Sequence, residues 1–429
     1  MSSPTPDEGH PTAHRRASGP SPRVRRRRRI VAIVAGSVAL LLVVTVGFVI
    51  YKYNDLSNGI HRSSIVLPTA SGKPGVPQNT GETNILIMGL DSRLDENGNP
   101  LPATVYNALH AGDGSDGGYN TNVLMLVHIP AGGGKAVGIS IPRDDYAALA
   151  GSPDGVSMSK IKEAYGLELD DKLKALVNAG GISRADAYQQ ARAAARQTEI
   201  TTVSNFLGGV TINHFIEVTM AAFYQIAVAV QPITVCLNEA TSDIYSGADF
   251  PAGVQQLSAS QAVSFVRQRR DTSGSGLDFT DLDRDRRQQA FIVSLAYKLK
   301  QADTFTNLGT LQTLIDTAKQ NIALDSGFDL LSFAQQASRL AGGNISFTTL
   351  PITGYATRNG EDVNLVDLDQ IHTMVAQLLS DHPTSSPTPK TTGGGASSST
   401  PAAVAATPGQ NVYTDPATPL QSGSIPCVK

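Results

Sequence analysis

An uncharged apolar run near the start of the chain places the first constraint on its folding. Residues Ile30–Ile50 read IVAIVAGSVALLLVVTVGFVI, and this run follows directly on five arginines, Arg25 to Arg29. A helix of this length spans the hydrocarbon core of a bilayer, and flanking arginines stay on the cytoplasmic side. We therefore expect one transmembrane helix, a cytoplasmic N-terminus, and an extracytoplasmic location for everything after Tyr51.

A cleaved signal peptide is the alternative reading of the same run. The run is longer than the usual apolar core of a signal peptide, and the segment after it, YKYNDLSNGIHR, contains no A-x-A cleavage site. We therefore expect the helix to remain as a membrane anchor.

Composition excludes several classes of protein. With 41% hydrophobic residues the chain is not disordered overall, and its net charge of -3 argues against a nucleic-acid partner. Cys236 and Cys427 are too few for a disulfide framework or a zinc site of C-x-x-C spacing. The histidines form no H-E-x-x-H pair, so no transition-metal site is predicted from spacing.

Composition also divides the chain into segments. Residues 1–29 form a basic cytoplasmic N-terminus and residues 30–50 the transmembrane helix. Residues 51–83 lack apolar periodicity and are predicted to form an extracytoplasmic stalk. Residues 84–382 are predicted to form the main folded domain. Residues 383–429 are predicted to form a flexible tail. Most of this segment is rich in Pro, Ser, Thr and Gly, and such a composition cannot bury a core.

The predicted domain alternates short apolar runs with amphipathic ones. NILIMGL, NVLMLVHI and KAVGISI have the length and composition of strands buried on both faces, and the PAGGG between the second and third suits a hairpin turn. Residues 183–206 and 220–230 have helical patterns, and Ser258 with Gln261 has the spacing of a capping box. This alternation predicts an α/β fold, a layered α/β/α domain with a central mixed β-sheet.

Charged residues follow two of the predicted strands. Asp91 comes directly after ILIMGL, and Arg143 comes after ISIP. Open α/β sheets bind ligands at the ends of their strands, so these side chains indicate an anion and metal site.

Two further segments contribute arginines. In VSFVRQRR, Arg267 and Arg269 lie on one side if the chain is extended there, and two guanidinium forks suit a phosphate. In DLDRDRRQQAFIVSL, Arg284 and Gln288 head a helical stripe that continues with apolar residues. The stripe favours a cleft lined by Arg284 and Gln288, and a structural salt-bridge network is an equal alternative.

The segments GLDSR, SIPRD, KIKEAY, FVRQRR and DLDRDRRQQ, in this order behind an N-terminal anchor, resemble the LytR-CpsA-Psr family. The resemblance implies an extracytoplasmic phosphotransferase. Such an enzyme moves a glycopolymer from a polyprenyl-pyrophosphate carrier to peptidoglycan in the cell wall and forms a phosphodiester. The expected partners are therefore the lipid-linked glycan, the peptidoglycan acceptor and the membrane, with no nucleic acid.

The resemblance also implies roles for individual residues. Asp91 would bind Mg²⁺, the expected cofactor, and Asp91 and Arg143 would be catalytic. Phosphoryl transfer depends mainly on positioning and charge neutralisation, which agrees with a clamp of arginines and a metal ion. The residues expected to bind the pyrophosphate are Arg143, Arg267, Arg269, Arg284 and Gln288, with Arg93 and Lys160 as secondary candidates.

The sequence departs from the family pattern at the second metal ligand. The family usually has R-S-D or R-T-D before its second strand, whereas this chain has Asn120, Thr121 and Asn122. An amide oxygen can bind Mg²⁺, so Asn122 is the second predicted ligand, but the lost charge should weaken the metal site and the activity. Lys162 stands where the family usually has Asn.

Three points stay open at the level of sequence. Cys427 either pairs with Cys236 in an oxidising exterior or leaves two free thiols. Hydrolysis of the same pyrophosphate-linked lipid, with water as the acceptor, is an alternative reaction. A non-catalytic polyprenyl-phosphate-binding protein or envelope regulator is an alternative of a different class, which Asn122 favours.

Overall fold

The computed structural model describes residues 50–68, 82–112, 118–131, 134–300, 308–330, 332–333, 344–380, 413 and 415–429. The chain forms two compact units, which divide between Asn58 and Gly59, and residues 50–58 of the first unit are helical. The predicted basic N-terminus, the predicted transmembrane helix except Ile50, and residues 383–412 of the predicted tail lie outside the described residues. Across the described ranges, no helix is both long and apolar enough to cross a membrane.

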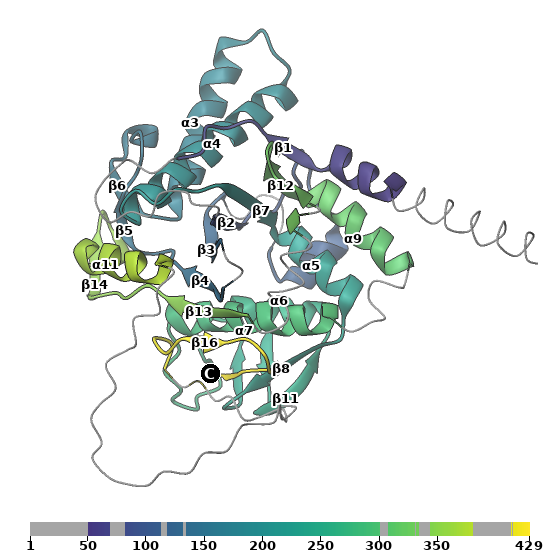
Figure 1. The fold of residues 1–429 in the computed structure, drawn as a ribbon, viewed down its shortest axis with the longest axis vertical. Coiled ribbons are helices and arrows are strands. Elements are labelled where there is room, and N and C mark those ends of the chain that lie inside the picture. The colour runs from purple at the N-terminus through teal and green to yellow at the C-terminus, as the bar shows by residue number, and fades with distance from the viewer. Residues whose placement is uncertain are drawn as a thin grey trace, which may run out of the picture. The chain divides into compact units, whose positions relative to one another are not determined.

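A mixed sheet lies at the centre of the second unit, as the sequence predicted (Figure 1). Three pairs of neighbouring strands are parallel, β1 with β12, β2 with β7 and β4 with β13, and the other pairs are antiparallel. In spatial order the described strands are β1 (His61–Ser63), β12 (Ile322–Asp325), β7 (His214–Thr219), β2 (Thr83–Leu90), β3 (Thr121–Ile129), β4 (Ala136–Ser140), β13 (Ile345–Thr349) and β16 (Leu420–Gln421).

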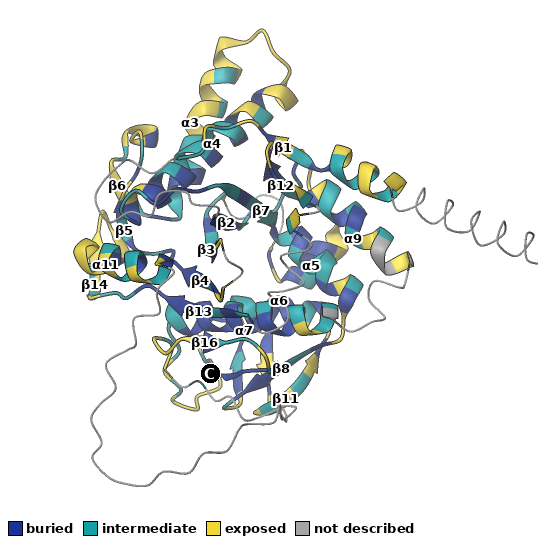
Figure 2. Ribbon diagram, viewed as in Figure 1, coloured by how far each residue is buried: buried dark blue, intermediate teal, exposed yellow. Residues whose placement is uncertain are grey.

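Apolar side chains on both faces hold this sheet between helices. Leu86 on β2 is directly opposite Leu126 on β3, and both are fully buried against α4 (Arg184–Phe206) and α11 (Leu368–Leu379). The other face is covered by α5 (Met220–Val230) and α9 (Leu308–Asn321), so the layers are α/β/α (Figure 1). Figure 2 shows the central strands as buried and the far ends of the helices as exposed.

The remaining elements surround this core. The other described helices are α2 (Ala103–Leu109), α3 (Glu163–Ala179), α6 (Ala259–Arg267), α7 (Asp281–Lys300) and the short η1 (Pro153–Gly155). The predicted capping box opens α6, with Ser258 and Gln261 bonded reciprocally. Small sheets are formed by β5 (Tyr146–Ala148) with β6 (Met158–Lys160), β9 (Thr241–Asp243) with β10 (Ala248–Phe250), β14 (Gly354–Arg358) with β15 (Glu361–Leu365), and β8 (Ile233–Leu237) with β11 (Gly253–Leu257) and β17 (Cys427–Val428).

Two predicted segment boundaries are wrong. Residues of the predicted stalk, His61–Ser63, form β1 and extend the central sheet beside β12. The end of the predicted tail folds back, so that β16 joins the central sheet and β17 joins β8. The reason is local: Leu420 and Val428 are fully buried, and strand edges satisfy the backbone groups of these short segments.

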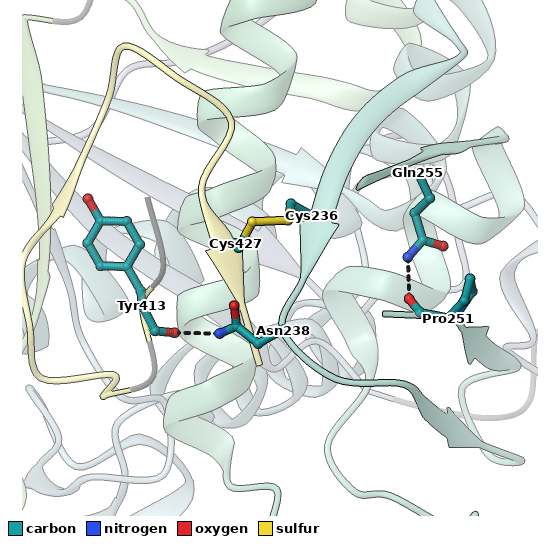
Figure 3. Close-up of a disulfide and its surroundings, with 6 residues drawn as sticks. All are labelled: Cys236, Asn238, Pro251, Gln255, Tyr413 and Cys427. Atoms are coloured by element: carbon teal, nitrogen blue, oxygen red, sulfur yellow. Dashed lines mark hydrogen bonds between the residues drawn. A yellow bond between two sulfur atoms is a disulfide. The ribbon is translucent and has the colours of Figure 1, made fainter. Parts of the chain in front are cut away.

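A disulfide fixes the folded-back segment. Cys236 on β8 and Cys427 on β17 are directly paired across the parallel strands and are bonded to each other (Figure 3). Asn238 supports the same contact, since its side-chain amide donates to the backbone oxygen of Tyr413 at 3.1 Å (Figure 3). The open question about the two cysteines is thereby settled as a bridge that closes 191 residues of chain.

Charged side chains of α4 are buried beneath the sheet. Arg192 lies 2.8 Å from Glu96, and Arg196 lies 2.8 Å from Glu217 on β7, with all four side chains at most 4% exposed. Each guanidinium group therefore has carboxyl partners within hydrogen-bond distance, as burial of charge requires. One turn further along α4, Glu199 is fully buried and accepts a hydrogen bond from the backbone N–H of Tyr165 at 2.9 Å.

We predict that Cys427→Ser lowers the stability of the protein. In the chain-entropy model, opening a loop of this size costs about 5 kcal/mol, and measured values for native disulfides are about 2–5 kcal/mol. Thermal unfolding should show a lower Tm for Cys427→Ser and for Cys236→Ser, with no further loss in the double variant. An additional loss in the double variant would show that the two thiols act separately.

We also predict that Glu199 makes the stability fall as pH rises. Burial raises the pKa of Glu199 to about 8 from an ordinary value of 4.5. The carboxyl group stays neutral in the folded state while the unfolded chain ionises, so stability decreases between pH 4.5 and 8, by at most about 1.4 kcal/mol per pH unit. Denaturant unfolding should show this slope in the wild type and a shallower one in Glu199→Gln; equal slopes would contradict the assignment.

Candidate functional site

Three of the predicted phosphate-binding arginines meet at one carboxylate, Asp281. Arg143, just past the end of β4, contacts it through Nε at 3.3 Å and Nη2 at 3.1 Å. Arg284, in the first turn of α7, lies 3.3 Å from it. Arg269, which follows α6, lies 3.4 Å from it. The side chains of Arg143 and Arg284 are 5% and 3% exposed, while Arg269 is 47% exposed and leaves the cluster open to solvent.

The electrostatics of this arginine cluster, defined as Arg143, Arg269 and Arg284 around Asp281, follow from burial and mutual repulsion. Burial and the nearby Arg284 lower the pKa of Arg143 to about 10, so Arg143 is still charged at neutral pH. Burial opposes ionisation of Asp281, but the three arginines outweigh it and lower its pKa to about 2. Asp144 also contacts Arg143 but is paired with Lys162. Burial raises the pKa of Asp285, beside Arg284, to about 7. The cluster therefore keeps an excess of positive charge, which favours a multiply charged anion.

A second group of predicted residues lies at the end of β2. The Arg93 guanidinium forms an ion pair with Asp91 and donates through Nε to the backbone oxygen of Ala111 at 3.1 Å. Arg267 donates to the backbone oxygen of His110 at 3.3 Å, at the end of α2. The field of Asp91 acts on Arg267, whose pKa is lowered by burial in spite of that carboxylate.

We expected an extended chain from Arg267 to Arg269, and this prediction is wrong for Arg267, which is helical. Arg267 is the last residue of α6, because the capping box starts a helix that runs to this point. Between the two arginines, Gln268 is fully buried, accepts a hydrogen bond from Arg287 at 2.7 Å and donates to Thr241 at 2.6 Å. Arg267 therefore contacts the end of α2, whereas Arg269 contacts Asp281.

Asn122 lies beside the arginine cluster and has an open acceptor. Its backbone oxygen accepts from Arg284 at 3.1 Å, and its Oδ1 is buried without a hydrogen-bond partner. Asp91 and Asn122 are at the same end of the β2–β3 pair, since the Asp91 N–H donates to the Asn120 oxygen at 2.9 Å. One carboxylate and one unsatisfied amide oxygen are donors that fit Mg²⁺, which takes few protein ligands beside substrate phosphates. In the residues that are described, no three His, Cys, Asp or Glu side chains gather as a metal site.

The other predicted residues occupy the edges of this region. Lys160 forms an ion pair with Glu361 at 2.8 Å, and Gln288 donates weakly to the Val266 oxygen at 3.5 Å. Lys162 contacts Asp144 at 2.6 Å, and Asp144 lies 3.5 Å from Arg143, so this lysine adjoins the cluster.

Two acidic residues of the site were missed from the sequence. Asp281 has the appearance of an ordinary helix-start acid, and Asp144 that of a surface residue in SIPRDD. Their signal was present in the charge pattern, since each acid follows or precedes a candidate arginine by at most three positions. Arg284 contacts both Asp281 and Asp285, so it takes part in ion pairs as well as lying in the arginine cluster.

The chain is similar to proteins that are named for cell wall biosynthesis. Residues 50–380 match the model of the LytR_cpsA_psr family. The chain is 35% identical over 354 residues to the cell wall biosynthesis protein LcpA of Corynebacterium glutamicum, covering 82% of this chain and 65% of that protein. The probable cell wall biosynthesis protein LcpB of the same organism is 26% identical, covering 67% of this chain and 59% of that protein.

A further relative carries a name that describes a reaction. It is the polyisoprenyl-teichoic acid–peptidoglycan teichoic acid transferase TagU of Oceanobacillus iheyensis, which is 26% identical, covering 69% of this chain and 74% of that protein. The chain spans less than two thirds of the length of the two Corynebacterium relatives. The family match covers well over half of this chain, and it includes β2, β4, α6 and α7 with all the site residues described above. The chain therefore belongs to the LytR-CpsA-Psr family.

Proposed function

We propose that this protein is a membrane-anchored phosphotransferase that moves a glycopolymer from a polyprenyl-pyrophosphate carrier to peptidoglycan. Family membership supports the reaction class, and the name of the TagU relative describes a transfer of this kind. The observation that carries the proposal is the convergence of Arg143, Arg269 and Arg284 on one carboxylate. A pyrophosphate presents several anionic oxygens and matches this excess of positive charge better than Asp281 does.

The arrangement suits displacement at phosphorus. A hydroxyl of the acceptor attacks the phosphorus that bears the glycan, the new P–O bond forms, and the bridging P–O bond breaks. Polyprenyl monophosphate leaves, and the hydroxyl proton passes to a base or to solvent. The arginines bind and orient the two phosphates and stabilise the charge that develops on the leaving oxygen, and such electrostatic stabilisation is usually the largest catalytic contribution.

Mg²⁺ belongs to the proposal as the cofactor. Asp91 and the open Oδ1 of Asn122 would hold it, beside the arginine cluster through Arg284. When bound, the ion would neutralise phosphate charge. Arg93 contacts Asp91 and would keep its carboxylate oriented.

The location follows from the same proposal. The lipid carrier lies in a membrane and its acceptor lies in the wall, so the domain belongs on the outer side of the cell membrane. The apolar run of residues 30–50 behind five arginines supports a single-pass anchor with a cytoplasmic N-terminus.

We predict that Arg143→Ala strongly slows transfer. The change removes a buried guanidinium that touches the anion site, and loss of one such group costs about 10²–10³ in rate. Turnover of a short polyprenyl-pyrophosphate glycan with peptidoglycan fragments and Mg²⁺ measures this. Arg270→Ala is the matched control, because Arg270 packs over Tyr245 outside the cluster and should keep near wild-type turnover.

The same assay separates the alternatives. Release of polyprenyl phosphate without an acceptor would indicate hydrolysis. Tight binding of the lipid, with no turnover at any Mg²⁺ concentration, would indicate a non-catalytic carrier or regulator. Asn122 favours this alternative, because it replaces a metal-binding carboxylate by an amide.

We predict that Asn122→Asp strengthens the metal site. A second carboxylate in place of an amide adds negative charge next to Asp91, so half-maximal turnover should occur at about tenfold lower Mg²⁺. Asn359→Asp adds the same charge at an exposed turn between β14 and β15 and should leave the Mg²⁺ dependence unchanged. An identical dependence in the wild type and Asn122→Asp would argue against a metal at this position.

A further inference from the structure

A fully buried glutamate lies in the loop after β2, a few residues beyond Asp91 and Arg93. Glu96 stands five positions after Asp91 and is 0% exposed. Its carboxylate contacts Arg192 through both oxygens, at 2.8 and 2.9 Å, and Arg196 at 3.0 Å. Its backbone oxygen also accepts from the side chain of Gln189 at 2.8 Å. The loop after β2 is thus attached to α4 at Glu96 by both its side chain and its backbone.

The stretch between the two residues is short and has its own hydrogen bonds. Ser92 Oγ donates to the Leu94 oxygen and accepts from the Leu94 N–H, both at 3.0 Å. The Arg93 oxygen accepts from the Tyr106 hydroxyl at 2.7 Å. Only Leu94 and Asp95 separate Glu96 from Arg93 in the chain, so we expect a shift at Glu96 to reach Arg93, whose guanidinium contacts Asp91.

Glu217 completes the same charge network from a different kind of element. It lies on β7, where its backbone is paired with β2 on one side and with β12 on the other. Its carboxylate contacts Arg192 and Arg196, and these arginines outweigh burial and lower its pKa to about 2. The two glutamates therefore share their partners but differ in how firmly their backbones are held.

We propose that Glu96 is a positioning residue, which holds the Asp91–Arg93 segment in its working geometry by anchoring the loop to Arg192 and Arg196. The inference rests on the proposed function, because it assigns Asp91 and Arg93 to the reaction.

The energetics favour movement of the loop rather than of the strand. Removing one buried carboxylate leaves a buried positive charge in excess, which is strongly destabilising unless water or another group reaches it. β7 cannot move aside without breaking hydrogen bonds to both neighbours. The loop after β2 has an isolated bridge between Leu94 and Pro100, and at Glu96 its backbone has single hydrogen bonds to Gln189 and Gln320 instead of paired strands on both sides. We therefore expect the loop to move rather than β7.

The matched pair Glu96→Gln and Glu217→Gln tests this in the full-length protein. Both variants keep the shape of the side chain and remove one charge from the same network. The assay runs at pH 8, above the pKa of about 7 to which burial raises Glu96. We expect both variants to lose thermal stability, but only Glu96→Gln to lose kcat, by about tenfold to a hundredfold, because a small misplacement of reacting groups has this effect. The KM for the lipid donor should change little, since the arginine cluster is intact.

A second readout does not depend on turnover. Hydrogen exchange of residues 92–101 should become faster in Glu96→Gln and stay as in the wild type in Glu217→Gln. Equal loss of kcat in the two variants, or unchanged exchange in Glu96→Gln, would overturn the positioning role. Absence of turnover in the wild type, with the exchange difference present, would instead reject the proposed function and leave the anchoring of the loop established.

Discussion

Three guanidinium groups repel one another, and they share a small volume here because Asp281 lies between them. The arginines come from parts of the chain that are far apart: the end of β4, the segment after α6 and the first turn of α7. The carboxylate at the start of α7 is therefore the point where the central sheet, α6 and α7 meet. A change in the position of α7 would move these charged groups apart and disrupt the anion site.

The C-terminal segment fixes that helix. Arg286 and Arg287, in the same turns as Arg284, donate to backbone oxygens of this segment, at Pro416 and at Lys429. Lys429 also contacts Asp283 at 3.3 Å. Since the disulfide holds the segment to β8, the geometry of the arginine cluster depends on residues that are more than a hundred positions later in the sequence.

Local patterns predicted much of this structure, and long-range pairing accounts for what they missed. The apolar runs that became β2, β3 and β4 and the capping box of α6 are determined by neighbouring residues, so they were predicted correctly. β1, β16 and β17 are two- or three-residue strands whose stability comes from the sheets that they join. In the site, arginines at element ends were predicted, but their opposite charge, Asp281, was not. Only tertiary contacts distinguish it from other acids at helix starts.

Two buried charge networks among the described residues differ in how they meet solvent. Around Arg192 and Arg196, two arginines meet two glutamates, and all four side chains are nearly inaccessible, so this network presents no charged group to a ligand. Around Asp281, three arginines and Lys162 meet the carboxyl groups of Asp281, Asp144 and Asp285, and the network reaches solvent through Arg269. Burial raises the pKa of the adjacent Asp285 to about 7, so it contributes only part of a negative charge at neutral pH. The first network is complete without a ligand, whereas the second keeps a positive excess that an anionic substrate would neutralise.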